Sequence, residues 1–345
     1  MSQPSVLQTH DVYAQQNPPL MAFNPLCDFQ TQQEAMREKF TELAGSVAKR
    51  TDPVPVIEYV AEDDPRFDEI RFRFESEPGF FVPAHLLLPK GAYRSNSVRL
   101  PVVIGLQGHS TGMHISLGRA KFEGDEQTIA DGDRDFAIQA VARGYAAVAM
   151  EQRGFGELDG TVSEGANRCQ QVSMQALMLG RTLIGERASD VSRLIDALTH
   201  FTACDTGRVG IMGNSGGGTA SFYTACIEPR IKIAMPSCAF CSLHDSIFSL
   251  HHCVCNYIPG LLKYFEMGDL ALLIAPRPLI VVCGRTDSIF PLAGVEREFA
   301  TVRSIYAAAG VPEHCRLVVG QGGHRFYAEQ SWPVYADALS RQSIK

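Results

Sequence analysis

Apolar and polar positions divide the chain into an irregular start, a group of closely spaced strand-like runs, and a long region where strands and helices alternate. From residue 31 to 49, apolar residues recur at helical spacing, and Pro53 and Pro55 then interrupt the pattern. Three short β-type runs follow, at residues 56–60, 70–74 and 80–88. Their close spacing predicts an antiparallel meander at the edge of a sheet.

Beyond residue 100, the strand-like runs become continuously apolar, which is typical of strands buried on both faces. They cover residues 101–106, 146–150, 209–212, 231–235, 279–283 and 317–319. Helical patterns lie between them, among them 135–143, a long stretch at about 174–201, and 295–309. This alternation predicts an α/β fold with a mostly parallel, eight-stranded sheet and helices on both faces.

The domain organisation follows from the same pattern. We expect residues 1–55 to form a partly helical N-terminal appendage. Residues 56–345 should form one large catalytic domain with an excursion at about 240–270. The chain has 345 residues, of which 45% are hydrophobic and 20% charged, an ordinary globular composition.

Charge and the first residues narrow the possible partners and location. The formal net charge is -7, whereas binding of nucleic-acid phosphates needs a basic surface. The first 19 residues are polar and lack the basic start and apolar core of a secretory signal. No run approaches the roughly 20 apolar residues of a membrane span. We therefore expect a cytoplasmic protein with no nucleic-acid or membrane partner.

The ten cysteines raise the question of disulfides or a metal. Without an export signal, free thiols are the simpler interpretation. Cys238 and Cys241 form a C-x-x-C, and further histidines and cysteines follow as far as Cys255, a spacing that zinc ligands can have. However, Cys238 ends an apolar run and no second C-x-x-C completes the set. A thioredoxin-like redox pair is also disfavoured, because that motif opens a helix. We expect no metal.

The strongest candidate for chemistry is Ser215. Residues 213–217 read Gly-Asn-Ser-Gly-Gly, which fits the G-x-S-x-G nucleophile elbow, and they lie between a predicted strand and a predicted helix. Such a turn holds the serine in a strained conformation above a helix N-terminus that favours negative charge. A glycine-rich phosphate or turn loop is the alternative interpretation.

A serine nucleophile needs a base, and the base needs an orienting acid. His324 follows the run at 317–319 and Asp287 follows the run at 279–283, so both should lie at carboxyl ends of parallel strands. We expect His324 as the base and Asp287 as the acid, in the chain order Ser, Asp, His. Asp269 is the rival acid, and Asp287 could instead be a turn former. His314 precedes its strand and is disfavoured.

The oxyanion intermediate needs two converging donors. We expect the backbone N–H of Gly216 and that of His109, in the loop after the first buried strand, with Ser110 as the alternative. Glu151 and Arg153 follow the next strand and could bind polar groups of the substrate. A structural role that braces the loop is the favoured interpretation of these two residues.

The chain resembles bacterial α/β-hydrolases described as acetyl xylan esterase-like or dienelactone hydrolase-related. The matching stretches are residues 105–112, 143–156, 180–198, 208–218 and 275–291. They extend over most of residues 80–335, and the resemblance implies an α/β-hydrolase fold. It also implies that the family's Ser, Asp and His fall on Ser215, Asp287 and His324, and that residues 252–269 cover the site.

The resemblance has two departures. Dienelactone hydrolases proper use a cysteine nucleophile, and the better-known deacetylases carry Gln where this chain has Gly216. We therefore expect a serine carboxylic-ester hydrolase, acetyl esterase-like, that acts through an acyl-enzyme without a cofactor. Its substrate should be a small-molecule or carbohydrate ester. The alternatives are a serine peptidase of the prolyl-oligopeptidase type and a non-catalytic binding protein of the same fold.

Overall fold

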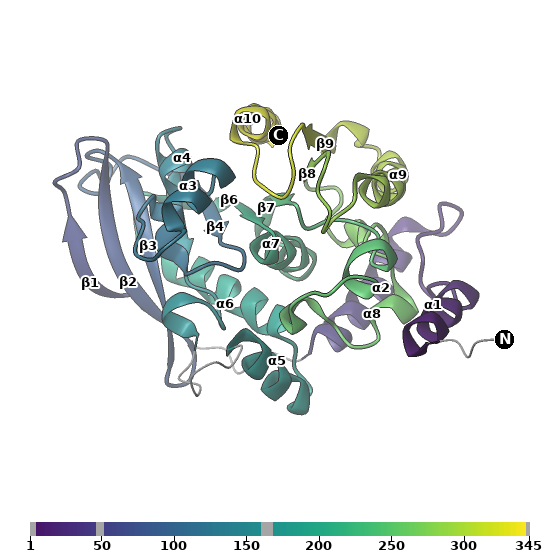
Figure 1. Cartoon of the computed structure of the whole chain (residues 1–345). Helices are drawn as coiled ribbons and strands as arrows, with labels where there is room; N and C mark the ends of the chain where they lie inside the picture. Colours follow the sequence, from purple (N-terminus) through teal and green to yellow (C-terminus); the bar gives the residue numbers. More distant parts are fainter. Residues whose placement is uncertain (1–4, 46–51, 160–167, 343–345) are drawn as a thin grey trace.

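A computed structural model describes residues 5–45, 52–159 and 168–342 (Figure 1). Nine strands form one sheet in the order β1-β2-β3-β5-β4-β6-β7-β8-β9. They are β1 (Val56–Ala61), β2 (Phe67–Glu77), β3 (Phe80–Pro89), β4 (Leu100–Leu106), β5 (Ala146–Met150), β6 (Cys204–Asn214), β7 (Ile231–Ser237), β8 (Leu279–Gly284) and β9 (Cys315–Gly320). The sheet thus has one strand more than the expected eight, and β1 is a mostly exposed strand at its edge.

The sheet has an antiparallel part and a parallel part. β1, β2 and β3 form a meander, and β3 runs antiparallel to β5. From β5 onward, all neighbouring strands are parallel. The carboxyl ends of the strands from β5 to β9 therefore meet at one edge, as expected for a site in this class of fold.

From β4 onward, helices alternate with the strands. The α-helices are α1 (Val6–Gln16), α2 (Phe29–Ala44), α3 (Asp125–Gly132), α4 (Phe136–Val141), α5 (Arg168–Met178), α6 (Leu183–Leu198), α7 (Gly216–Ile227), α8 (Leu261–Tyr264), α9 (Leu292–Ala308) and α10 (Ala328–Gln342). Short helical turns are η1 (Met113–Leu117), η2 (Gly156–Leu158), η3 (His244–Phe248), η4 (Val254–Asn256), η5 (Asp269–Leu273) and η6 (Pro312–His314). Two of these turns, η3 and η4, lie within the expected excursion at 240–270, η5 crosses its end, and α8 is its α-helix.

Two apolar cores cover the two faces of the sheet. In β4, Val102 and Ile104 point into a core formed with α2, α6, α7 and α9. Val103 points the other way, into a core that includes Phe136 of α4 and Trp332 of α10. Because alternate residues of a strand face opposite sides, a continuously apolar strand needs both layers of helices. The expected α/β-hydrolase architecture, with helices on both faces, is confirmed.

The long helix expected at 174–201 is two helices. α5 ends before Gly180, which has a φ of 70°, and α6 begins after Thr182. The Thr182 side chain accepts a hydrogen bond from Gly185 N at 3.0 Å and so caps the first turn of α6. The apolar spacing continues across the break, so only the glycine and the cap residue mark it.

The N-terminal segment is uneven in its packing. No residue of α1 is buried, whereas Met36 and Phe40 of α2 belong to the main core. In Figure 1, α1 lies at the periphery and α2 lies closer to the sheet. A domain boundary at residue 55 stays a prediction. None of the helices described here is long and apolar enough to cross a membrane.

Candidate active site

Ser215 occupies the sharp turn between β6 and α7. Its backbone has φ 57° and ψ -127°, a region that non-glycine residues rarely adopt. The strain is held by main-chain hydrogen bonds, because Ser215 N donates to Ser237 O at 2.9 Å and Thr219 N donates to Ser215 O at 2.8 Å. Gly216 is the first residue of α7, so its N–H has no acceptor within the helix. The sequence-predicted elbow is therefore present as a strand, turn and helix.

Asp287 and His324 are paired at the ends of β8 and β9. His324 Nδ1 donates to Asp287 Oδ2 at 2.8 Å, and Asp287 Oδ1 accepts from Ile289 N at 2.8 Å and from Phe290 N at 3.2 Å. The Phe290 ring stacks on the imidazole at a centroid distance of 5.9 Å. Burial raises the pKa of Asp287, but the hydrogen bond and charge of His324 outweigh it, so the pKa lies below its usual value.

Backbone contacts bring this pair beside the elbow. Cys238 Sγ donates to Arg325 O at 3.2 Å, and Ser237 Oγ contacts the same oxygen at 3.4 Å. Ser237 is also the residue whose carbonyl holds Ser215 N. The loop that carries His324 therefore lies against the residues that fix the serine. Among the contacts of the described residues, none joins Ser215 Oγ to the His324 ring.

The rival acid and base have other partners. Asp269 Oδ1 accepts from Phe23 N at 2.8 Å and its Oδ2 accepts from Glu266 N at 2.8 Å, so this carboxylate anchors the N-terminal segment. His314 Nδ1 donates to Pro276 O at 2.6 Å. Neither contact involves the β8–β9 loops that hold Asp287 and His324.

The loop after β4 lies directly over the nucleophile. A Cβ on Gly108 would be 2.9 Å from Ser215 Cβ, and a Cβ on Gly216 would be 2.9 Å from His109 Nδ1. The residues expected to supply the two oxyanion donors, His109 and Gly216, are therefore neighbours. The His109 ring also makes an edge contact with Phe155 at a centroid distance of 5.0 Å. Their backbone N–H groups stay our prediction for the oxyanion hole.

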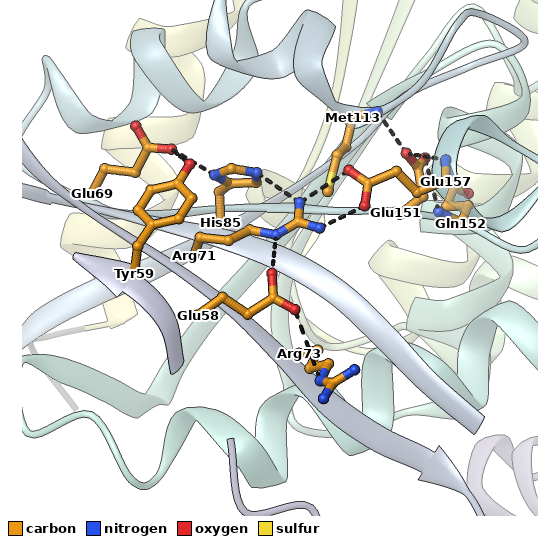
Figure 2. Close-up of polar contacts among 10 residues, drawn as sticks. All are labelled: Glu58, Tyr59, Glu69, Arg71, Arg73, His85, Met113, Glu151, Gln152 and Glu157. Carbon is orange, nitrogen blue, oxygen red and sulfur yellow. Dashed lines mark hydrogen bonds and ion pairs between the residues drawn. The ribbon is translucent and has the colours of Figure 1, made fainter. Parts of the chain in front are cut away.

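Glu151 is a buried brace for two loops. Its carboxylate accepts backbone hydrogen bonds from Met113 N and Glu157 N, each at 3.2 Å, and from Gln152 N at 3.3 Å (Figure 2). Burial raises the pKa of Glu151 to about 7, although the three N–H groups lower it. These contacts support a structural role, and Glu151 also lines the cavity described below.

Arg153 is held in an ion-pair network. Its guanidinium lies 2.8 Å from Asp190, 2.7 Å from Glu77 and 3.3 Å from Glu186. It also stacks over the Phe80 ring at 4.3 Å. Arg153 does not line the cavity beside the elbow, as far as the described residues define that cavity. The favoured interpretation, a brace rather than a substrate ligand, has the support of these contacts.

A cavity of about 680 Å³ opens between the loops that follow β4 and β5. Its lining includes both apolar and charged groups. It is lined by His109, Ser110, Thr111, His114, Lys121, Phe122, Glu151, Gly154, Phe155, Gly156, Glu157, Asp159 and Cys169. Neither Ser215 nor His324 is part of this lining among the described residues, and the cavity adjoins the elbow through His109.

Within residues 5–45, 52–159 and 168–342, two groups of side chains have the composition of metal ligands. In each group, the potential ligand atoms lie within 4.8 Å of one another. One consists of Cys238, Asp287 and His324, in which Asp287 and His324 already bind each other. The other consists of His109, Cys169, Cys253 and Cys255. We consider the second group below.

Comparisons with known proteins identify the family of the chain. Residues 79–262, more than half of the chain, match the X-Pro dipeptidyl-peptidase (S15) family. The chain belongs to the S15 family. The matched range contains Ser215, Gly216 and His109, whereas Asp287 and His324 lie beyond it. Membership places the chain among hydrolases.

The relatives of this S15 family member include a protein of Bacillus subtilis that carries the name of a hydrolase, YtaP. The two are 27% identical over 192 residues, which is 55% of this chain and 62% of YtaP. The match thus spans less than two thirds of that relative's length.

Solved structures of carbohydrate esterases share the fold. A Bacteroides fragilis protein named an acetyl xylan esterase superposes with a TM-score of 0.75 at 17% identity, over 92% of this chain and 83% of that one. A glucuronoyl esterase from Solibacter usitatus has a TM-score of 0.69 at 16% identity, over 94% and 97% of the two chains. At these identities, the likeness shows the α/β-hydrolase fold.

The sequence did not indicate that Cys169, Cys253 and Cys255 lie next to His109. Between Cys169 and the pair Cys253 and Cys255 lie α6, β6, α7, β7 and η3, and His109 lies on a different loop again. The C-x-x-C formed by Cys238 and Cys241 is not part of this group. Cys241 Sγ instead contacts Pro291 O at 3.6 Å. The C-x-C at 253–255 was the only local signal in the sequence.

Proposed function

We propose that this chain is a serine hydrolase that cleaves carboxylic esters through an acyl-enzyme. One observation carries the proposal. The His324–Asp287 pair, at 2.8 Å, lies on a loop that contacts Ser237 and Cys238, next to a strained Ser215 at a helix N-terminus. A base held in one tautomer beside a partly exposed serine is the arrangement that acyl transfer needs.

Each residue has a role in the proposed reaction. Ser215 Oγ attacks the ester carbonyl while His324 Nε2 removes its proton. Asp287 fixes the imidazole through Nδ1 and stabilises the imidazolium. The N–H groups of Gly216 and His109 bind the negative oxygen of the tetrahedral intermediate. His324 then protonates the leaving alcohol, and a water molecule reverses the sequence to release the acid.

The choice of an ester has two supports. The structural relatives are named for ester cleavage on carbohydrates, by deacetylation of xylan and by cleavage of glucuronoyl esters. The cavity beside His109 offers both apolar and charged walls for a polar substrate. We infer a small-molecule or carbohydrate ester as the substrate class. None of the steps above requires a cofactor.

Peptide cleavage is a second candidate, favoured by the name of the matched family, X-Pro dipeptidyl-peptidase. The same three residues would act, with His324 protonating a leaving amine in place of an alcohol. An amine is the poorer leaving group, so a peptidase has to place the leaving nitrogen within reach of His324. The rates on matched ester and amide substrates therefore separate the two candidates.

The test uses the full chain and its Ser215→Ala variant. We expect a fluorophosphonate adduct on Ser215, hydrolysis of short-chain nitrophenyl esters, and loss of both in the variant. Faster cleavage of X-Pro nitroanilides than of any nitrophenyl or acetylated-sugar ester would favour the peptidase. A folded protein that forms no adduct and cleaves neither class would instead be a binding protein of this fold.

A further inference from the structure

Four potential metal ligands converge beside the elbow from three separate segments. His109 comes from the loop after β4, Cys169 from the start of α5, and Cys253 and Cys255 from either side of Val254 at η4. Their ligand atoms all lie within 4.8 Å of one another, and His109 Nε2 lies 3.2 Å from Cys255 Sγ. All ten cysteines of the chain are free of disulfides.

The spacing suits a tetrahedral ion. Zinc binds thiolate at about 2.3 Å and imidazole at about 2.0–2.1 Å, so neighbouring ligand atoms of a tetrahedral site lie about 3.5–3.8 Å apart. Three cysteines and one histidine form one of the usual structural zinc sets. The four ligand atoms, all within 4.8 Å of one another, lie close to this range.

A buried positive charge next to the cluster is the second observation. The Arg187 side chain is fully buried, with Nε and Nη2 donating to Arg153 O at 3.2 and 2.7 Å. Nη2 lies 3.7 Å from Cys169 Sγ, and the guanidinium stacks on Phe155 at 4.3 Å. Nη1 is buried without a hydrogen-bond partner. Among the described residues, no carboxylate lies within ion-pair distance of Arg187.

Charge balance explains this arginine. Burial of an unpaired cation is costly, so a neighbouring anion is expected. Three thiolates and one Zn²⁺ carry a net charge of -1, which Arg187 neutralises. The three cysteines also belong to a small apolar cluster that includes Phe155 and Leu183 and is separate from the two main cores, and the His109 ring contacts Phe155. Such a shell keeps water away from a structural metal.

Other cysteines of the chain lack this setting. Cys204, Cys226 and Cys283 are buried within the main core, and burial raises the pKa of each thiol to about 12. They therefore stay protonated and serve packing alone. The contrast is between single thiols in an apolar core and a group of three thiols facing a histidine and an unpaired arginine.

We propose that His109 Nε2 and the thiolates of Cys169, Cys253 and Cys255 bind one Zn²⁺ ion. Four protein ligands leave no open position, so the ion is structural and takes no part in ester cleavage. It joins the loop that carries His109 to α5 and η4, and so fixes one side of the elbow. The proposal goes beyond the proposed hydrolase activity, and it departs from our expectation of no metal, which rested on residues 238–255 alone.

The first test measures the metal content of the full chain, purified with a mild reductant and without an affinity metal column. Plasma mass spectrometry should find one zinc per chain. Cys169→Ser and Cys255→Ser should lose the zinc, whereas the matched core variants Cys204→Ser and Cys226→Ser should keep it. Ser215→Ala should also keep it, so failure of the hydrolase proposal and failure of the zinc proposal are distinguishable.

A second measurement does not depend on variants that might misfold. Wild-type protein is stripped with a chelator and reloaded with Co²⁺, which should give thiolate charge-transfer absorption in the near ultraviolet and tetrahedral bands in the visible. Wild-type protein that retains no zinc and gives no such bands would overturn the proposal. So would a disulfide among Cys169, Cys253 and Cys255 in protein alkylated at lysis, which would identify a redox pair instead.

Discussion

Two histidine–carboxylate pairs in this molecule look alike and differ in what they can do. His324 donates to Asp287 at 2.8 Å at the carboxyl ends of the parallel strands. His85, on the antiparallel strand β3, has Nδ1 2.6 Å from Glu69, but its Nε2 accepts from Arg71 at 2.8 Å (Figure 2). Both nitrogens of His85 are therefore occupied, whereas Nε2 of His324 has no partner among the described residues.

The two pairs also differ in the number of partners around them. Glu69 also binds Arg119, and hydrogen bonds from His85 and Arg119 lower its pKa to about 2 even though burial raises it. Burial and the charge of Arg71 lower the pKa of His85 against the opposing effect of Glu69. A saturated network stabilises the antiparallel edge. A pair with one free nitrogen beside a strained serine is available for proton transfer.

The largest expected difference between the His324–Asp287 pair and the His85–Glu69 pair is in kcat for ester hydrolysis. His324→Gln removes the base and should lower kcat for nitrophenyl esters by at least about 10⁴-fold, with little change in melting temperature. His85→Gln should leave kcat within about tenfold and reduce the free energy of unfolding by about 1–3 kcal/mol. Steady-state kinetics and denaturant unfolding of both variants check this. Similar losses of activity in the two variants would contradict the comparison.

The carboxylates should differ in the same way. Asp287→Asn keeps the shape of the side chain but favours the wrong tautomer of His324, so kcat should fall by about 10³–10⁴-fold. Glu69→Gln leaves Arg119 and His85 less well paired and should act on stability alone, by about 1–3 kcal/mol. The pH profile of kcat distinguishes the two effects, because only Asp287→Asn should change its shape.

Glu151 joins the two regions and supplies a test with pH. Its pKa rises from about 4.5 when unfolded to about 7 when folded, because it is buried. The folded state then binds the extra proton between these values, so stability is highest below pH ~4.5 and falls by up to about 3 kcal/mol as pH rises through 7. Glu151→Gln should remove this part of the pH dependence of unfolding. An unchanged slope between pH 5 and 8 would place the titration elsewhere.

The smallest expected effects come from the aromatic neighbours. Phe290 stacks on His324, and its replacement by Leu should lower kcat by up to about tenfold, because such contacts contribute about 0.5–1.5 kcal/mol. Tyr59 lies edge-on to His85 and donates to Glu69 at 3.0 Å. Tyr59→Phe should cost about 1 kcal/mol of stability and leave kcat unchanged. Kinetics and thermal unfolding measured side by side on both variants check this pair.

The parallel strands could be read from the sequence because each is a continuous apolar run. The run expected at 146–150 is β5 itself, and the positions of Ser215, Asp287 and His324 follow from which strand each residue ends. The break between α5 and α6 was missed, since apolar spacing continues through Gly180. The spacing of apolar residues indicates which positions are buried. It does not reveal a turn of the chain when the positions on both sides of the turn are buried.

The sequence could not predict the partner of a side chain where that partner comes from a remote segment. Arg153 could be placed after β5, but its carboxylates belong to β2 and α6. The C-x-C at 253–255 could be seen, but Cys169 and His109 could be joined to it only by the fold. Local patterns fix which edge of the sheet a residue occupies, and tertiary packing decides what it meets there.

The main-chain hydrogen bonds at Ser215 have a consequence for evolution. The strained turn is held by Ser237 O and by the start of α7, without help from the side chain at position 215. A lineage can therefore exchange the nucleophile, for instance serine for cysteine, while it keeps the turn. The shape of the turn and the reactivity of its side chain can therefore change independently in evolution. A single codon change can give the same fold a different chemistry.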